Sequence, residues 1–324
     1  MANGGVIGKR IIPTLLGAKG AWGINDLYHA SLDGVWPELV VPVLIDFLII
    51  AGGGGGGQQN AQAGGGAGGY LNSYGSESSG ANSASLSTIS CSLTNLYAVT
   101  VGAGGASSAN GSNSSFTGTA TDLSSISLIA IGGGFGYGGG NGGPGGNGGS
   151  GGGGGYTSVS NNSAAGTGTA NQGFAGGVSN ASPVNVALCA AFGGDLCNIT
   201  AVQGAGGGGA GAVGTSGPNN GAGGAGLASS ITGSSVTRAA GGSGRGTPNG
   251  NNEAMPTGSG SSSIGGGGEG GQNSGGNGII ILRYLNIFSV SNPGGGLTIS
   301  TATDGSDKVS TISAGSGNIQ FGAA

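Results

Sequence analysis

The sequence is poor in charged and aromatic residues. Asp, Glu, Lys and Arg make up 6% of the 324 residues and Phe, Trp and Tyr make up 5%, whereas about 25% of an average globular protein is charged. The seven Lys and Arg residues, in a chain with a net charge of −4, are too few to form a basic stripe. The composition therefore argues against a nucleic-acid partner.

Cysteine is also scarce. Cys91, Cys189 and Cys197 are odd in number and form no CxxC motif, whereas a disulfide framework would be denser. We therefore expect small buried or free thiols. Only Cys189 and Cys197 lie close enough in sequence to be considered as a bridge, and the sequence leaves that pairing open.

No long hydrophobic run is present. Residues 39–50 are apolar but contain Pro42 and Asp46, and crossing a bilayer takes about 20 residues. An apolar stretch near the start is interrupted by Pro13 and Gly17 and is not followed by a clear cleavage site, unlike a signal peptide. We expect a protein made in a cytoplasm, without membrane insertion.

Residue types that carry catalysis or bind metals are sparse. His29 is the only histidine, no GK[ST] motif exists, and Glu253 and Glu269 lie in glycine-rich loops. Asp304 and Asp307 come nearest to a metal-binding cluster, but a simple turn explains their spacing better. We expect no enzymatic activity, no cofactor and no metal site.

Glycine, by contrast, accounts for 86 residues, which gather in blocks between short β-prone segments. Collagen would carry Gly at every third position, and a flexible linker would lack the apolar segments. Disordered chains usually have high net charge, so a folded body is favoured over a low-complexity chain. Because glycine is costly to order, dense backbone hydrogen bonding or oligomerisation must offset that cost. We expect more than one copy per assembly.

Short strands are predicted where apolar residues alternate or where β-branched residues cluster before or after a glycine block. In residues 97–101, Tyr97, Val99 and Val101 share one face, and residues 279–284 form the strongest strand signal. Further strands are expected at residues 39–50, 125–131, 183–188, 199–202, 297–303 and 309–313. The fold class expected is all-β, with short strands in a sandwich-like body interleaved with packed polyglycine-II helices.

One glycine block has a period of three. In residues 139–155, the side chains of Asn141, Pro144, Asn147 and Ser150 are three positions apart. A helix of the polyproline-II type has three residues per turn and no internal hydrogen bonds, so its two bare edges must bond to neighbours. We infer polyglycine-II helices packed side by side, with a floppy loop as the alternative.

Composition divides the chain into three parts. Residues 1–38 carry both tryptophans, and residues 22–37 predict a short helix capped by Asn25 or Asp26, which would be a docking segment. The glycine-rich domain would span residues 39–285. Residues 286–324 contain fewer glycines and are expected to form a C-terminal β tail.

Five segments, in this order, resemble the glycine-rich domain of bacteriophage tail fibres and tail-tip adhesins. They are DFLIIAGGGGGG (46–57), YAVTVGAGG (97–105), SSF with the later LIAIGGG (114–116 and 128–134), Q with GAGGGGAGA (203–212) and GGNGIIILRY (275–284). Residues 22–37 also resemble a segment near the start of tail proteins in marine and related phages. Residues 308–321 resemble a strand pair that usually precedes such a domain, although here they follow it.

The resemblance implies a structural component of the virion tail, made in the host cytoplasm. It implies a trimeric or otherwise symmetric fibre or spike that contacts other tail proteins and binds a bacterial surface receptor through loops of the glycine-rich domain. A purely structural tail adaptor or fibre shaft is the alternative. A glycine-rich matrix or ice-binding protein would share the backbone physics but would not explain the docking segment.

Four aromatic residues adjoin bare glycine backbone: Phe135, Tyr137, Tyr156 and Phe174. They either pack against the glycine layer or expose their rings for stacking on sugars or apolar receptor groups. Both interpretations stay open, and these four residues are the candidate receptor-binding positions.

Overall fold

A computed structural model describes residues 42–58, 62–138, 142–155, 163–179, 202–217, 221–247, 263–271 and 273–324. Pro42–Ala324 forms one compact unit. The docking helix expected within residues 22–37 and the strand expected at residues 183–188 lie outside the described residues, as do Cys189, Cys197 and Tyr156.

Strands and extended segments account for nearly all of the described chain, which confirms the all-β class. The one helical element in the described ranges is a short 3₁₀ turn, η1 (Gly80–Asn82). The strands are β1 (Val43–Ile50), β2 (Tyr70–Asn72), β3 (Ile89–Cys91), β4 (Leu96–Thr100), β5 (Ser114–Thr119), β6 (Ser125–Ala130), β7 (Val202–Gln203), β8 (Leu227–Ser229), β9 (Val236–Arg238), β10 (Gly246–Thr247), β11 (Ile279–Leu285), β12 (Phe288–Ser291), β13 (Leu297–Asp304) and β14 (Asp307–Ala323).

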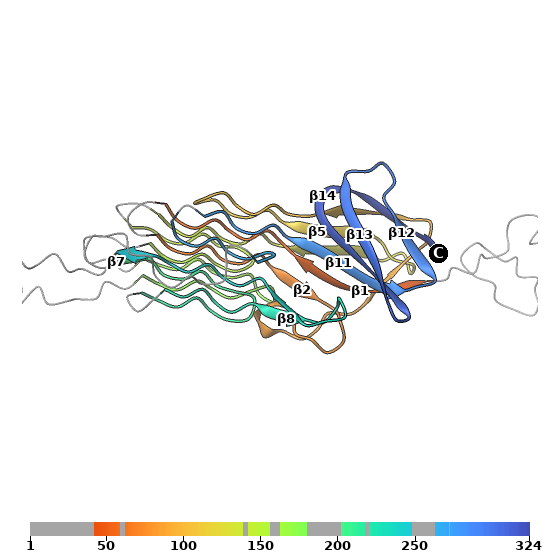
Figure 1. Cartoon of the computed structure of the whole chain (residues 1–324), viewed down its shortest axis with the longest axis horizontal. Helices are drawn as coiled ribbons and strands as arrows, with labels where there is room; N and C mark the ends of the chain where they lie inside the picture. Colours follow the sequence, from red (N-terminus) through yellow and green to blue (C-terminus); the bar gives the residue numbers. More distant parts are fainter. Residues whose placement is uncertain are drawn as a thin grey trace, which may run out of the picture. The chain divides into compact units, whose positions relative to one another are not determined.

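Ten of these strands form one nearly closed antiparallel sheet (Figure 1). Its main order is β2-β1-β11-β14-β4-β5-β6, with β12 and β13 on β14 and β3 on β1. Two small sheets, β8–β9 and β7–β10, lie outside it. The strands predicted at residues 97–101, 125–131 and 279–284 correspond to β4, β6 and β11, so the local apolar patterns located them well.

The two most apolar strands, β1 and β11, pair in the middle of the sheet and are buried on both faces. In β1, Phe47 and Ile49 enter one core cluster while Leu48 and Ile50 enter the other. A strand buried on both faces reads as a continuous hydrophobic run instead of an alternating one. This explains the FLII and IIIL runs in β1 and β11.

The core cluster enclosed by the sheet contains a chain of aromatic rings that includes the C-terminal strand. Tyr97 stacks on Phe116 with a centroid distance of 5.5 Å, and Phe321 meets Tyr97 and Tyr284 edge-on at 5.9 and 5.6 Å. Residues 286–324, which their composition sets apart as a tail, therefore share the core and sheet of the glycine-rich domain. The fall in glycine content marks a change from backbone packing to side-chain packing within one unit.

The 17-residue strand β14 bends so strongly that both of its ends reach the turn between β11 and β12, at residues 286 and 287. The Asn286 amide donates to the Ser306 carbonyl at 2.9 Å, and the Ala324 amide donates to the Ile287 carbonyl at 2.8 Å. Gly315, with φ +101°, lies in the middle of the strand, where the partners of β14 change from β11 and β13 to β4 and β12. A φ in this region favours glycine, which allows the bend that closes the sheet.

Beyond the strand ends the chain continues in extended segments that lie side by side (Figure 1). We call these segments the glycine array; it comprises residues 51–58, 62–69, 102–112, 131–138, 142–155, 163–179, 204–217, 221–226, 239–245, 263–271 and 273–278. Many of its amides bond to carbonyls of other segments. In residues 63–69, amides three positions apart bond to the same neighbouring segment, at 2.7–3.1 Å. Ala63, Gly66 and Gly69 donate to the carbonyls of Tyr137, Gly134 and Ile131, respectively. Gly64 and Ala67 donate to Ala205 and Gly208, and Gly65 and Gly68 donate to Gly268 and Gly265.

Around residues 52–57 the array has room for backbone alone. A Cβ atom built on each residue from Gly52 to Gly57 would lie 1.9–2.2 Å from a carbonyl oxygen of a neighbouring segment. Along residues 63–69, the residue numbers of the acceptors decrease in two of the neighbouring segments and increase in the third. Two neighbours therefore run antiparallel to residues 63–69, and one runs parallel. The buried amides and carbonyls thereby satisfy one another without regular strand pairing.

The block at residues 142–155 is not the single continuous run that its period of three predicts. Gly152 and Gly155 donate to Gly146 and Gly143, so the block folds back on itself. Pro144 and Asn147 are exposed as expected, but Ser150 is on the returning arm and is fully buried. Local periodicity could not reveal this reversal, because a glycine-rich segment turns without needing a special side chain.

Candidate functional site

One end of the glycine array is marked by β7 in Figure 1, and several described segments, among them residues 51–58 and 62–69, end there. Here Gly57 donates to Ala63, and Gly271 donates to Gly57. Arg245 donates to the Gln62 carbonyl at 2.7 Å. Backbone hydrogen bonds therefore hold the described segments together up to this end of the array.

Two of the candidate receptor-binding aromatics lie over bare glycine. The ring of Tyr137 occupies the space where a Cβ at Gly143 or Gly155 would lie, 2.5 and 2.6 Å away, and Phe135 does the same at Gly146 at 2.5 Å. Both side chains are half-buried. This geometry favours the packing interpretation for these two rings. Phe174 is half-buried as well, and its amide bonds to Gly209 in the interior of the array.

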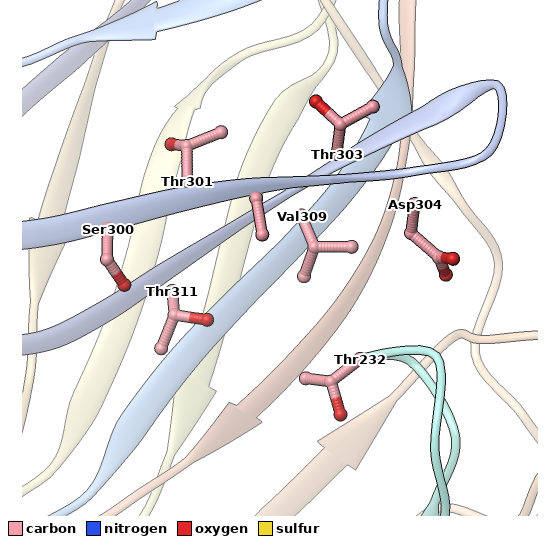
Figure 2. A pocket seen from close by; sticks show the side chains of 8 residues that line it. Thr232, Ser300, Thr301, Thr303, Asp304, Val309 and Thr311 are labelled. Carbon is pink, nitrogen blue, oxygen red and sulfur yellow. The ribbon is translucent and has the colours of Figure 1, made fainter.

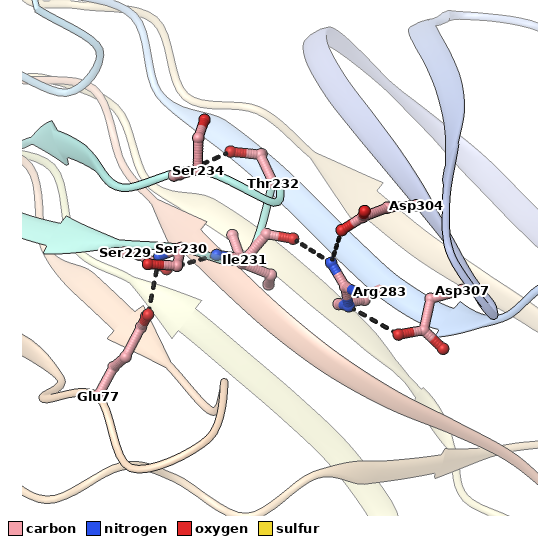
Figure 3. A network of polar contacts seen from close by, with 9 residues as sticks. All are labelled: Glu77, Ser229, Ser230, Ile231, Thr232, Ser234, Arg283, Asp304 and Asp307. Atoms are coloured by element: carbon pink, nitrogen blue, oxygen red, sulfur yellow. Dashed lines mark hydrogen bonds and ion pairs between the residues drawn. The ribbon is translucent and has the colours of Figure 1, made fainter.

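At the sheet, a network of polar contacts surrounds Arg283 of β11 (Figure 3). Its Nε donates to Asp307 Oδ2 at 2.9 Å, and one terminal nitrogen donates to Asp304 Oδ2 at 2.7 Å and to the Ile231 carbonyl at 3.1 Å. The guanidinium also lies over the ring of Tyr74, 5.4 Å from its centroid. Burial opposes the charged form, but the two carboxylates outweigh it and raise the pKa of Arg283.

Arg283 holds two elements that are distant in sequence. One is the β13–β14 turn, which contributes both carboxylates, and the other is the β8–β9 turn at residues 230–235. The second turn is also fixed by the Ser230 amide, which donates to Glu77 Oε1 at 2.7 Å, and by the fully buried Ile231 side chain. The Arg283 cluster therefore sets the separation between the β8–β9 turn and β13.

A cleft of about 300 Å³ lies between these two elements (Figure 2). It is lined by Thr232, Ser300, Thr301, Ala302, Thr303, Asp304, Val309 and Thr311. We call it the threonine cleft. In Figure 2 the side chains of Ser300, Asp304 and Thr311 lie on the side of β13 and β14 that faces Thr232, whereas Thr301 and Thr303 point the other way. This arrangement follows from the alternation of side chains along a strand.

A further carboxylate, Asp46 of β1, lies directly across from Arg283 in the β1–β11 register. The Ser73 hydroxyl donates to it at 3.4 Å. Burial raises the pKa of Asp46 above its ordinary value, although the hydrogen bond from Ser73 and the nearby Arg283 act in the opposite direction.

The sequence identified Asp304 and Asp307 as a pair of nearby carboxylates but did not indicate that Arg283 binds them. The turn expected there is present, and Arg283 reaches both carboxylates from the neighbouring strand β11. An arginine at the end of the run IIIL was the available signal, because a charge beside a buried strand needs a partner. The Ser and Thr side chains of the cleft gave no motif that could have marked them.

The described residues show no group of three His, Cys, Asp or Glu side chains that could hold a metal ion. Among the same residues, no helix has the length and apolar character to cross a bilayer.

Comparison with known proteins places most of the chain in one family. The profile of the family described as glycine-rich domain matches residues 36–285. No curated protein and no solved structure matches the chain. The matched region includes β1 to β11 and the whole array, and it covers well over half of the sequence. The chain therefore belongs to the glycine-rich domain family.

Proposed function

We propose that this chain is a tail fibre or tail-tip protein of a bacteriophage, a structural component of the virion that takes part in host attachment. The observation that carries the proposal is the order of the five motifs that resemble such proteins. Four of them cross the border between the sheet and the array: β1, β4 and β6 run out into glycine segments, and a glycine segment runs back into β11. The motifs therefore mark the architecture of the domain and are more than chance runs of glycine.

In this proposal the array is a bundle of polyglycine-II helices. The support is the rotation of hydrogen-bond partners with a period of three along residues 63–69, which is the number of residues per turn of such a helix. Because these segments are tied to neighbours on all sides, the array would be stiff and resistant to proteases. A stiff array is suited to presenting a contact surface away from the particle.

Host contact would be made at the end of the array marked by β7. The described segments that end there are anchored by backbone hydrogen bonds, such as those of Gly57 and Arg245. Loops on a rigid scaffold are a common location for binding residues, because the scaffold limits the entropy lost on binding. A bacterial surface receptor is the partner proposed for this end.

The remaining parts of the proposal concern assembly. Residues 1–38 would dock onto other tail proteins, and the chain would form a homo-oligomer, with a trimer favoured. It would be made in the host cytoplasm and incorporated into the virion tail, with no enzymatic role, nucleic-acid partner or membrane insertion. Light scattering of the purified chain tests the copy number, and mass spectrometry of purified particles tests whether the chain is present in virions.

The attachment role is tested by competition. The folded chain should bind host cells and reduce adsorption of the phage, and a variant with Gly54 replaced by Val, which cannot pack the array, should do neither. If the folded chain neither binds cells nor blocks adsorption, the attachment role fails. Its presence in particles under that outcome would identify the purely structural adaptor or fibre shaft.

A further inference from the structure

The threonine cleft has hydrogen-bonding groups that the protein itself does not use. In the part of the chain that the structure describes, no hydrogen bond involves the hydroxyl of Ser300 or Thr311. Asp304 offers Oδ2 to Arg283, and its side chain is 45% exposed. Unpaired hydroxyls and a carboxylate that converge on one cleft can donate to and accept from a polar ligand.

The charge of the cleft favours a neutral ligand. Asp304 is the only ionisable residue among those that line the cleft in the described chain, and Arg283 compensates its charge at 2.7 Å. A cation would have to compete with that guanidinium, and an anion would be repelled by the carboxylate. A carboxylate held in this way remains a strong, fixed acceptor for hydroxyl groups.

The cleft also offers small apolar surfaces. Val309 is buried in the core cluster that also contains Leu48 and Ile50 of β1. Ala302 lies across from Val309 in the β13–β14 register. Their methyl groups alternate with the polar groups of Ser300, Asp304 and Thr311. A ligand that matches this pattern has hydroxyl groups and aliphatic C–H groups on one compact ring.

The cleft has room for about one ring. Its volume of about 300 Å³ is at the lower end of the range of about 300–1,000 Å³ for ligand pockets. Both walls are held in place, because Arg283 bonds to Asp304 on one side and to the Ile231 carbonyl on the other. The site is therefore formed before any ligand arrives.

We propose that the threonine cleft binds a single neutral saccharide residue. Asp304 accepts hydrogen bonds from two ring hydroxyls, Ser300, Thr311 and Thr232 complete the polar contacts, and Val309 and Ala302 meet the C–H groups. The inference rests on the cleft alone and does not depend on the tail proposal, because the cleft is formed by the sheet and the β8–β9 turn.

The test uses two-dimensional amide NMR of the full chain. The probes are methyl glycosides of glucose, galactose, mannose and N-acetylglucosamine, with N-acetylneuraminic acid as the charged probe and glycerol as the acyclic polyol. At least one neutral glycoside at ~50 mM, about fifty times a dissociation constant of ~1 mM, should shift the amides of Thr232, Asp304 and Thr311. Combining Ser300→Ala with Thr311→Val should weaken its binding at least tenfold.

Thr298→Val is the matched control, because Thr298 is an exposed threonine of the same strand that does not line the cleft; the affinity of this variant for the glycoside should stay within about twofold of the wild type. The proposal is overturned if no neutral glycoside shifts the cleft amides. It is also overturned if glycerol or N-acetylneuraminic acid binds as well as every glycoside, or if Thr298→Val weakens binding as much as the cleft substitutions.

Discussion

Arg283 and Asp304 lie 2.7 Å apart and join the end of β11 to the end of β13. The same guanidinium holds Asp307 and the carbonyl of Ile231. This side chain of β11 thus connects the β13–β14 turn to the β8–β9 turn, and the two approach each other only in the folded chain. The connection matters because these elements form both walls of the threonine cleft.

Replacing Arg283 by Met should lower the free energy of unfolding by roughly 2–3 kcal/mol, because it leaves two close carboxylates and one carbonyl without their donor. The arginine side chain is only 13% exposed, so water cannot fully replace it. Chemical denaturation at neutral pH measures the loss. Lys308→Met is the control and should cost about 1 kcal/mol at most, since Lys308 donates only to the Phe288 carbonyl at 2.9 Å. Equal losses in the two variants would contradict the bridging role.

Gly54→Ala should destabilise the chain by ~3 kcal/mol or more, because the new methyl group would lie 2.1 Å from the Gly134 carbonyl oxygen. Backbone on all sides of Gly54 leaves no flexible neighbour that could give way. Gly322→Ala serves as the comparison, since its Cβ would meet only Ser289 Oγ at 3.4 Å; it should change stability by ~0.5 kcal/mol or less. Thermal unfolding of both variants decides the point, and a Gly54→Ala protein as stable as the wild type would refute the close packing.

The amides of Gly52 to Gly57 should exchange with deuterium as slowly as those of β1 and β11. Each donates to a carbonyl of another segment at 2.8–3.1 Å, although none belongs to a regular strand. Slow exchange requires both a hydrogen bond and restricted local opening. Hydrogen–deuterium exchange with peptide-level mass spectrometry gives the comparison. Fast, even uptake across these six residues would show that the array opens independently of the sheet.

Stability should fall as the pH rises from about 9 to about 12. Burial raises the pKa of the Cys91 thiol from 9.0 to about 12 and that of the Tyr97 hydroxyl from 10.0 to about 12. A group with a raised folded-state pKa contributes stability that is present below its unfolded pKa and is lost as the pH rises through the folded one.

Urea midpoints between pH 8 and pH 12 measure this loss. Tyr97→Phe should be less stable at neutral pH, because the hydroxyl accepts from the Ser92 amide at 2.6 Å and donates to Thr119 at 3.2 Å. Its stability should nevertheless decline less steeply at alkaline pH, since one of the two groups is gone. An unchanged slope in that variant would exclude Tyr97 as a source of the decline.

The local pattern predicted the strands well and the connections poorly. Tyr97, Val99 and Val101 alternate, and a strand is found there, because alternation is enforced by the residues themselves and their nearest neighbours. The reversal within residues 142–155 and the integration of β14 into the sheet were not predictable. Both depend on contacts between residues distant in sequence, and glycine offers no side chain whose pattern would reveal them.

In the candidate site, too, the sequence identified single residues but not their contacts. Asp304 and Asp307 could be selected from the sequence as a pair of acidic residues at a turn, but the sequence did not show that Arg283 binds them or that Thr232 lies near them. Phe135 and Tyr137 could be selected as rings beside bare glycine, and only their contacts with Gly146 and Gly143 favour packing over exposure.

By itself, the sequence determined the all-β class, the strands that lead into glycine blocks and the need for backbone to bond with backbone. Composition dictates these properties directly, since a chain with few large or charged side chains has little else with which to satisfy its buried amides. Only the tertiary structure decided which segments are neighbours, in which direction they run and where the threonine cleft forms. Glycine segments are nearly interchangeable as partners, so their pairing is imposed by the sheet from which they extend.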